Sequence, residues 1–283
     1  MFLHTKYSIL SILFLIFCMA SNTYSGTDLQ HNKQSKELIF GVFPYLTPRL
    51  VEKMYSPIGH EFSKVLGQKV RFLTSSSYEK FVVNLDKQIY DIVFVQPFDY
   101  VKIADKYGYK PLAVRNEELR AILVVIPTSP IQKLSDLKGK TIGLPPKIAA
   151  ISYLTNRYLR NKGFTPGKDI KVKYFRSHFS CLHNVLIGSV AACGTAPPAM
   201  RVFNNRMNRE LRIFAKTKPI SNALFAVHPR VSDTTIKLLK NAITQLHRHT
   251  TGRKILEATK TNAFVEIKNS QYDEVRSMAK TFR

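Results

Sequence analysis

Short apolar runs alternate with segments of helical spacing, and this alternation constrains the fold more than any other feature of the chain. The first apolar runs are ELIFGVFP (37–44), KVRFLTS (69–75) and YDIVFVQP (90–97). Helical patterns follow them over about 48–66, 77–88 and 98–108, the second begun by Ser77 as a cap. Runs this apolar are typical of strands buried on both faces, so the repeats predict a mostly parallel sheet flanked by helices.

A second unit of the same kind begins at the strand-like run LRAILVVIP (119–127). Further strands are predicted at 141–144, 170–176, 190–196 and 211–217. The run NALFAVHP (222–229) is interpreted as a return to the first unit, with two helices and a trailing segment packing back on it. The prediction is an α/β protein of two lobes, 37–118 with 222–283 and 119–221, with a ligand cleft between them.

The first 25 residues have the pattern of a secretory signal peptide. Lys6 precedes an almost wholly apolar stretch over 9–19, and small residues lead to a cleavage site near Ser25. Cys18 raises the alternative of a lipoprotein, but bulky Phe17 precedes it. We therefore expect export to the periplasm, with 26–36 as a flexible lead-in.

The chain is strongly basic, with 43 Lys and Arg against 19 Asp and Glu and a net charge of +24. Such a charge favours an anionic partner. Export and the spread of the basic residues argue against nucleic acid, and no aromatic-basic recognition module is visible. A solvated basic face is the preferred interpretation, with contact to a membrane surface or an acidic protein as alternatives.

Sequence motifs of catalysis are absent. There is no Gly-x-Ser-x-Gly elbow, no phosphate-binding Walker loop and no HExxH or CxxC metal pattern, so neither an enzyme, a metal nor a cofactor is predicted. Cys181 beside His178 or His183 imitates a thiol-imidazole pair, but no third group is present to orient it. Cys181 and Cys193 either pair in a disulfide, since a helix start and a late strand approach each other in a β-α-β unit, or are small buried residues.

Several segments in order resemble the periplasmic solute-binding proteins of the phosphate, phosphite and phosphonate ABC transporters. The quoted pieces are FGVFPYLTPRLVEKMYSPIGHEFSKVLGQKVRF, YDIVFVQPFDYV, SPIQKLSDLKGKTIGLP and FRSHFSCLHNVLIGSVAACGTA, within about 37–270. The resemblance implies the two-lobed type II periplasmic binding fold. It also implies delivery of a small, anionic ligand to an ABC permease, with a sensor that reports ligand or partner binding to a membrane protein as the alternative. We expect a monomer.

The resemblance carries over only part of the family's binding site. In the family, the turn after the strand at 141–144 reads Asp-Pro-x-Ser-Thr-Ser, and its hydroxyls grip the phosphoryl oxygens. The matching positions here are Pro145, Pro146, Lys147, Ile148, Ala149 and Ala150, without a hydroxyl. The family's ligand-facing His matches His178, and its Asp after the next strand matches Ala196. We therefore expect a ligand other than a phosphonate, or no small ligand that binds tightly.

The candidate ligand-binding residues follow strand ends of both units: Tyr45, Gln96, Lys147, Ile148, Ala149, Ala150, His178 and Thr195. Because ligands lie outside the carboxyl ends of parallel strands, we expect Tyr45, Gln96, Lys147 and His178 to converge on one cavity. Lys147 beside a free helix N-terminus would make the second-lobe wall positive. The alternatives are that Tyr45 and Gln96 cover the core edge, Lys147 is merely solvated and His178 makes a buried hydrogen bond.

Overall fold

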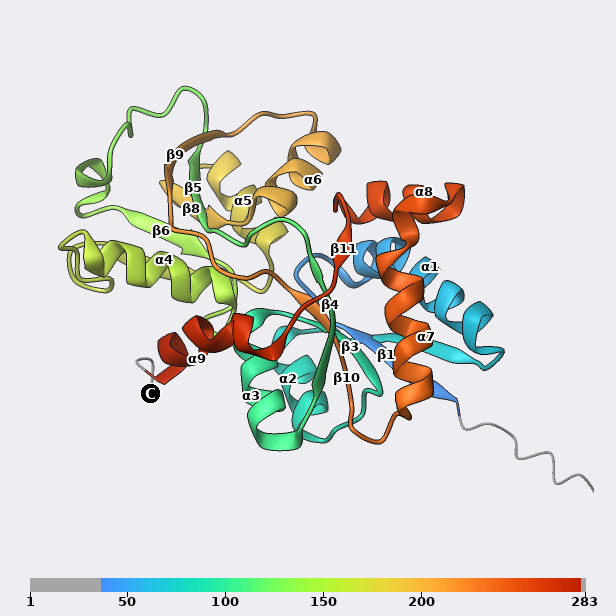
Figure 1. Cartoon of the computed structure of the whole chain (residues 1–283). Coiled ribbons are helices and arrows are strands. Elements are labelled where there is room, and N and C mark those ends of the chain that lie inside the picture. The colour runs from blue at the N-terminus through green and yellow to red at the C-terminus, as the bar shows by residue number, and fades with distance from the viewer. Residues whose placement is uncertain (1–36, 281–283) are drawn as a thin grey trace, which may run out of the picture. The chain divides into compact units, whose positions relative to one another are not determined.

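The strands of the protein form two mixed sheets in a computed structural model that describes residues 37–280. The larger sheet has six strands in the order β11-β4-β10-β3-β1-β2 (Figure 1). Its strands are β1 (Leu38–Val42), β2 (Val70–Thr74), β3 (Ile92–Val95), β4 (Lys110–Arg115), β10 (Leu224–Val227) and β11 (Phe264–Val265). The predicted signal peptide and the predicted lead-in lie outside the described residues.

The smaller sheet has five strands in the order β7-β6-β8-β5-β9. Its strands are β5 (Ile122–Val125), β6 (Thr141–Leu144), β7 (Lys171–Tyr174), β8 (Ala192–Thr195) and β9 (Arg212–Lys216). We call the six-stranded sheet with its helices the first lobe and the five-stranded sheet with its helices the second lobe. The chain crosses between the lobes twice, and the crossing segments pair through an antiparallel bridge between Leu119 and Ile220.

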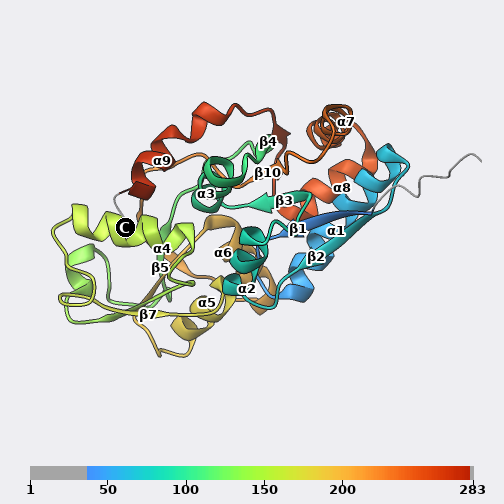
Figure 2. The ribbon, with the colours of Figure 1, turned by 90° about the horizontal axis from the view of Figure 1, so that it is seen from below.

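The helices of the first lobe cover both faces of its sheet (Figures 1 and 2). They are α1 (Pro48–Leu66), α2 (Tyr78–Asp86), α3 (Pro97–Tyr107), α7 (Asp233–Thr244), α8 (Thr250–Thr259) and α9 (Asp273–Lys280), with short 3-10 turns at Leu246–Arg248 and Asn269–Tyr272. Phe94 packs among α1, α7 and α8, whereas its neighbour Val93 packs among α2, α3 and α9. This alternation follows from the two faces of a strand.

The second lobe is covered by α4 (Ala150–Asn161), α5 (His178–Leu186) and α6 (Pro197–Met207), with a 3-10 turn at Leu134–Leu137. The first turns of α4 also reach the first lobe. Ala150, Ile151 and Leu154 are buried in the same apolar cluster as the α3 residue Phe98. The two lobes therefore share a continuous apolar contact next to the start of α4.

Sequence patterning predicted most of these elements, and Ser77 caps α2 as expected, since its Oγ accepts from the Lys80 N–H at 3.2 Å. It predicted no strand at β4. The Lys110-Pro111 start interrupts the apolar run there, and Pro111 lies opposite Ala226 beside a register shift of β10, where a missing N–H is tolerated. The crossing strands β5 and β10 run antiparallel to their neighbours, which makes both sheets mixed.

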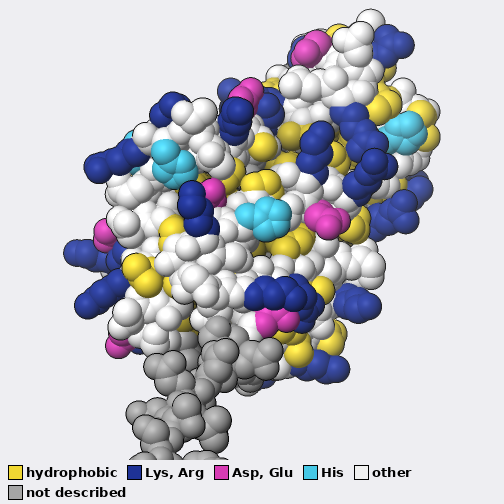
Figure 3. Space-filling view, turned by 90° about the vertical axis from the view of Figure 1, so that its right-hand side faces the viewer, with side chains coloured by type: hydrophobic (Ala, Val, Ile, Leu, Met, Phe, Trp, Pro, Cys, Tyr) yellow, Lys and Arg dark blue, Asp and Glu magenta, His cyan; other side chains and the backbone are white. Residues whose placement is uncertain are grey.

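Lys and Arg side chains are spread over the face of the protein in Figure 3, with few acidic side chains among them. They do not gather into one stripe in this view. Scattered exposed charges of this kind are well solvated and screened by salt. Among the described helices, none is long and apolar enough to cross a membrane.

Candidate functional site

A cavity of about 300 Å³ lies where strand ends of the two lobes meet. Phe43, Tyr45 and Gln96 reach it from the first lobe, and Ala150 and His178 reach it from the second. Each of these residues follows the carboxyl end of a strand or starts the next helix. This is the position at which α/β sheets bind small ligands.

Five of the eight candidate residues line this cavity: Tyr45, Gln96, Ala149, Ala150 and His178. The other three are not among its lining residues. Lys147 is exposed and Ile148 is half-buried, both in the turn before α4. Thr195 is fully buried behind His178. The cavity wall from the second lobe is therefore formed mainly by apolar side chains, with Ser177, His178 and Arg201 as its polar members and without the Lys147 ammonium.

Gln96 joins the two lobes through its side-chain amide. Its Oε1 accepts from the Ala150 N–H at 2.7 Å, and its Nε2 donates to the Ile148 carbonyl at 3.1 Å. Gln96 is 3% exposed, so these bonds lie out of solvent. A free helix N-terminus would bind an anion through such N–H groups. Here the Ala150 N–H at the start of α4 is occupied by a side chain of the opposite lobe.

Asp99 holds Gln96 in this orientation. Its Oδ2 accepts from Gln96 Nε2 at 2.8 Å and from the Tyr78 hydroxyl by a short hydrogen bond. Burial raises the pKa of Asp99 to about 6, although both hydrogen bonds oppose this shift. Burial, and then the charge of Asp99, raise the pKa of Tyr78 well above its ordinary value. Gln96, Asp99 and Tyr78 therefore form a buried polar network on the first-lobe side of the cavity.

His178 is the second buried titratable group of the wall. Its Nδ1 lies 2.8 Å from Thr195 Oγ1, and Ser177 caps the same helix by accepting from the Ser180 N–H at 3.1 Å. Burial lowers the pKa of His178 to about 4, so its imidazole is neutral at pH 7. Neutral imidazole carries one donor and one acceptor, so it offers hydrogen bonding but no charge to a ligand.

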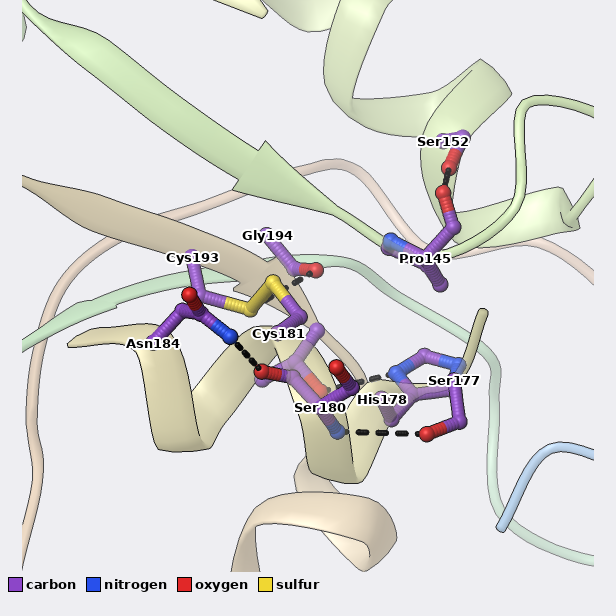
Figure 4. The surroundings of a disulfide bond; sticks show 10 residues. Pro145, Ser152, Ser177, His178, Ser180, Cys181, Asn184, Cys193 and Gly194 are labelled. Atoms are coloured by element: carbon purple, nitrogen blue, oxygen red, sulfur yellow. Dashed lines mark hydrogen bonds between the residues drawn. A yellow bond between two sulfur atoms is a disulfide. The ribbon is translucent and has the colours of Figure 1, made fainter. Parts of the chain in front are cut away.

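A disulfide joins Cys181 and Cys193, the pairing that the sequence left open (Figure 4). Their Cα atoms are 6.0 Å apart, and both residues are fully buried. Cys181 lies in the first turn of α5, and Cys193 lies two residues before Thr195. The bond therefore ties the start of α5 to β8, close to the contact between His178 and Thr195.

Arg115, at the end of β4, is a cavity residue that sequence patterning missed because it missed the strand. Its Nη2 donates to the Tyr55 hydroxyl at 2.7 Å and to the Thr259 carbonyl at 2.9 Å. Its guanidinium carbon lies 5.5 Å from the centre of the Phe94 ring. The Tyr55 hydroxyl also lies 3.3 Å from that of Tyr45, so Tyr45 belongs to the same polar group.

His178 and Asp99 should give opposite dependences of stability on pH. As pH falls from about 6.5 to 4, the unfolded chain protonates its histidine while buried His178 stays neutral, so stability is lost. Over about 6 to 4, folded Asp99 takes up its proton first, so stability is gained. Each change is on the order of 3 kcal/mol, from about 2 pKa units at 1.36 kcal/mol each.

We therefore expect His178→Gln to gain stability relative to the unchanged protein as pH falls from 7 to 4.5, and Asp99→Asn to lose it. Urea unfolding at pH 7, 5.5 and 4.5 measures both differences. The comparison uses the change in the free energy of unfolding with pH. A loss of stability that is the same at every pH therefore does not affect the result. Parallel curves for all three proteins would contradict a lowered pKa of His178 and a raised pKa of Asp99.

Two α/β lobes with a cavity at their facing strand ends define a two-lobed binding protein of the type II periplasmic fold. Among solved structures, PhnD1 from Prochlorococcus marinus in complex with methylphosphonate matches with a TM-score of 0.77, 17% identity, and coverage of 87% of this chain and 98% of that one. A binding protein component of an ABC phosphonate transporter from Pseudomonas aeruginosa also reaches 0.77, with 16% identity and coverage of 86% and 85%. The aliphatic sulphonate binding protein SsuA from Escherichia coli reaches 0.58, with 14% identity and coverage of 87% and 86%.

A family model described as ABC transporter, phosphonate, periplasmic substrate-binding protein matches residues 40–272. The chain therefore belongs to this family, whose members are periplasmic substrate-binding proteins of ABC transporters and not enzymes. No curated protein matches the chain. Within the described residues, no group of three or more His, Cys, Asp or Glu is placed to hold a metal ion.

Proposed function

We propose that this protein captures a small anionic ligand in the periplasm and delivers it to the permease of an ABC importer. The observation that carries the proposal is the cavity between the lobes, lined by Tyr45, Gln96 and His178 at the ends of strands from both sheets. Its volume of about 300 Å³ suits a small molecule. Membership of the family is the reason for proposing delivery to an ABC importer.

An anionic ligand is favoured by the charged residues around the cavity. Three arginines, Arg115, Arg120 and Arg201, line it against two glutamates, Glu117 and Glu118. Arg120 and Glu118 pair with each other at 3.2 Å, which leaves an excess of positive charge. An excess of one sign of charge around a concave site favours ligands of the opposite sign.

A phosphonate is expected to bind weakly. The turn before α4 has no hydroxyl, and the Ala150 N–H already donates to Gln96. A phosphoryl group would lose several charge-assisted hydrogen bonds, each worth about 1.5–3 kcal/mol. Micromolar binding of 2-aminoethylphosphonate in calorimetry would contradict this part of the proposal.

The proposal is tested by a thermal-shift screen of carboxylates, sulfonates, phosphonates, phosphate and nucleotides at matched ionic strength. A specific ligand at 100 times its Kd stabilises the folded state by about 2.7 kcal/mol, which raises Tm by roughly 5–10 °C in a protein of this size. Absence of any shift across the screen would contradict binding of a small anion.

A substitution that fills the cavity tests whether the ligand binds there. Ala196 is half-buried and lines the cavity, so Ala196→Phe should weaken binding of the hit by at least about tenfold while the unliganded protein stays folded. Lys147→Ala is the matched control, since Lys147 is exposed and not among the lining residues. The loaded protein should also stimulate ATP hydrolysis by a reconstituted importer, and binding without stimulation would favour a sensor role.

A further inference from the structure

Arg115 is a buried cation whose hydrogen bonding is incomplete. It is 6% exposed, and its Nε has no hydrogen-bond partner. Its Nη2 donates only to neutral oxygens, those of Tyr55 and Thr259. Among the described residues, no ion pair includes Arg115. A buried charge without a counter-charge is costly, so such groups are normally paired.

Glu117 is an acidic residue that interacts electrostatically with Arg115, but no ion pair joins the two. Glu117 lines the same cavity; its Oε1 accepts from the Asn262 N–H at 2.5 Å, and its Oε2 is buried without a hydrogen-bond partner. The ring of Phe94 lies 5.5 Å from the guanidinium carbon and contributes only a weak cation-π contact. Arg115 itself lines the cavity. An anionic group of a ligand in the cavity could therefore form the direct pair with Arg115 that Glu117 does not form.

The start of α4, on the opposite wall, is less suited to a charged group. The Ala150 N–H donates to Gln96 at 2.7 Å, and the Ser152 N–H donates to the Ala149 carbonyl at 2.9 Å. The side chains of Ala149, Ala150 and Ile151 line the cavity there. This wall offers apolar surface, whereas the Arg115 wall offers a charged donor.

We infer that Arg115 binds the anionic group of the ligand, and that the ligand is an organic anion whose apolar body faces the start of α4. This rests on the proposed function and names its ligand class. A guanidinium can bind the two oxygens of a carboxylate, and equally those of a sulfonate or phosphonate. Phe43, Ala196 and Pro197 complete the apolar walls around the body of the ligand.

The first experiment compares ligands of one shape on the unchanged protein. The probes are 3-phenylpropionate, its sulfonate and phosphonate analogues, the neutral 3-phenylpropanamide and the cationic 3-phenylpropylamine, each measured by calorimetry. We expect at least one anion to bind at least about tenfold more tightly than the amide, and the amine to bind least. Equal binding of the amide, or tighter binding of the amine, would overturn the inference, the latter because Glu117 would then govern the site.

The second experiment changes the guanidinium. Arg115→Lys keeps a cation but loses the planar guanidinium that can bind two oxygens, and Arg115→Met removes the charge, so affinity for the tightest anion should fall by at least about tenfold in each. Arg212→Met is the matched control, because Arg212 Nη2 likewise donates to two neutral oxygens, the backbone carbonyls of Ser129 and Ile131, and Arg212 is not among the residues that line the cavity. Thermal unfolding without ligand shows whether each variant folds. If Arg115→Met does not fold, the ligand series on the unchanged protein still tests the inference.

The outcomes separate the two proposals. An anion that Ala196→Phe excludes but that both Arg115 variants bind unchanged would overturn the role of Arg115 and leave the proposed function standing. Failure of every anion in the wider screen would overturn the proposed function, and this inference with it. Loss of binding in both Arg115 variants, with binding retained in the Arg212 variant, would support the assignment.

Discussion

Phe94→Ala is expected to lower the free energy of unfolding by about 3–5 kcal/mol, among the largest losses for a single substitution in this protein. Phe94 is 1% exposed in the middle of the first lobe. Its ring centre lies 4.8 Å from that of Phe225, 5.1 Å from that of Tyr55 and 5.7 Å from that of Phe43. Removing the ring leaves a cavity among aromatic side chains that cannot all move in to fill it.

Urea unfolding measures the effect of Phe94→Ala. The midpoint should fall while the slope with urea stays unchanged, because the surface exposed on unfolding is nearly the same. Val83→Ala is the control, since Val83 is 50% exposed and its truncation should change stability by less than about 0.5 kcal/mol. A loss below about 1.5 kcal/mol for Phe94→Ala would show that the cluster repacks and is not a rigid core.

The same substitution should affect the proposed binding site. Phe94 lines the cavity and lies beneath the guanidinium of Arg115, so its ring separates the charged wall from the core. Phe94→Leu keeps most of the apolar volume and is expected to cost less stability than the alanine variant. If both variants bind the ligand as tightly as the unchanged protein at low temperature, the ring stabilises the core and does not contribute to ligand binding.

The buried strands were predictable because each one is an uninterrupted apolar run bounded by polar or turn residues. Residues 92–95 read IVFV, and every one is buried in β3. β4 was not predictable in this way, because Lys110 and Pro111 break the run and only the three residues from Leu112 to Val114 continue it before Arg115. Because the strand was not predicted, Arg115 was not identified as a cavity residue. In the sequence, a charged residue at such a position cannot be told from a solvated surface side chain.

Contacts between the lobes could not be predicted from the sequence, for a different reason. Gln96 and Ala150 are 54 residues apart, and their hydrogen bond depends on how two separate sheets are placed. The general rule on strand ends brought Tyr45, Gln96 and His178 to one cavity. It did not distinguish a side chain that lines the cavity from one that points to solvent, which is why Lys147 was grouped with them.

Removing the disulfide between Cys181 and Cys193 is expected to cost about 3 kcal/mol, which lowers Tm by roughly 6–12 °C in a protein of this size. The two cysteines are 12 residues apart, and closing a loop of that length restricts the unfolded chain by about this amount. Both lie in the buried cluster with Phe203 and Leu182. Loss of the link therefore acts on the second lobe.

Two treatments separate the covalent link from the packing of the sulfur atoms. Reduction of the unchanged protein breaks the bond but keeps both sulfurs, whereas Cys181→Ala with Cys193→Ala removes them as well. Dithiothreitol should lower the Tm of the unchanged protein and leave that of the double variant unchanged. A further loss in the double variant, beyond the reduced protein, would measure the cavity left by the sulfur atoms.

Thiol labelling decides whether the bond forms in the periplasm. Unfolded, unreduced protein recovered from there should show no reactive cysteine, and the single Cys181→Ala variant should show one, at Cys193. Two reactive thiols in the unchanged protein would contradict the pairing. Because the bond ties the start of α5 to β8, reduction should also loosen the 2.8 Å contact between His178 and Thr195. Ligand affinity should then fall on reduction at a temperature where the protein remains folded, and unchanged affinity would show that His178 is held by packing alone.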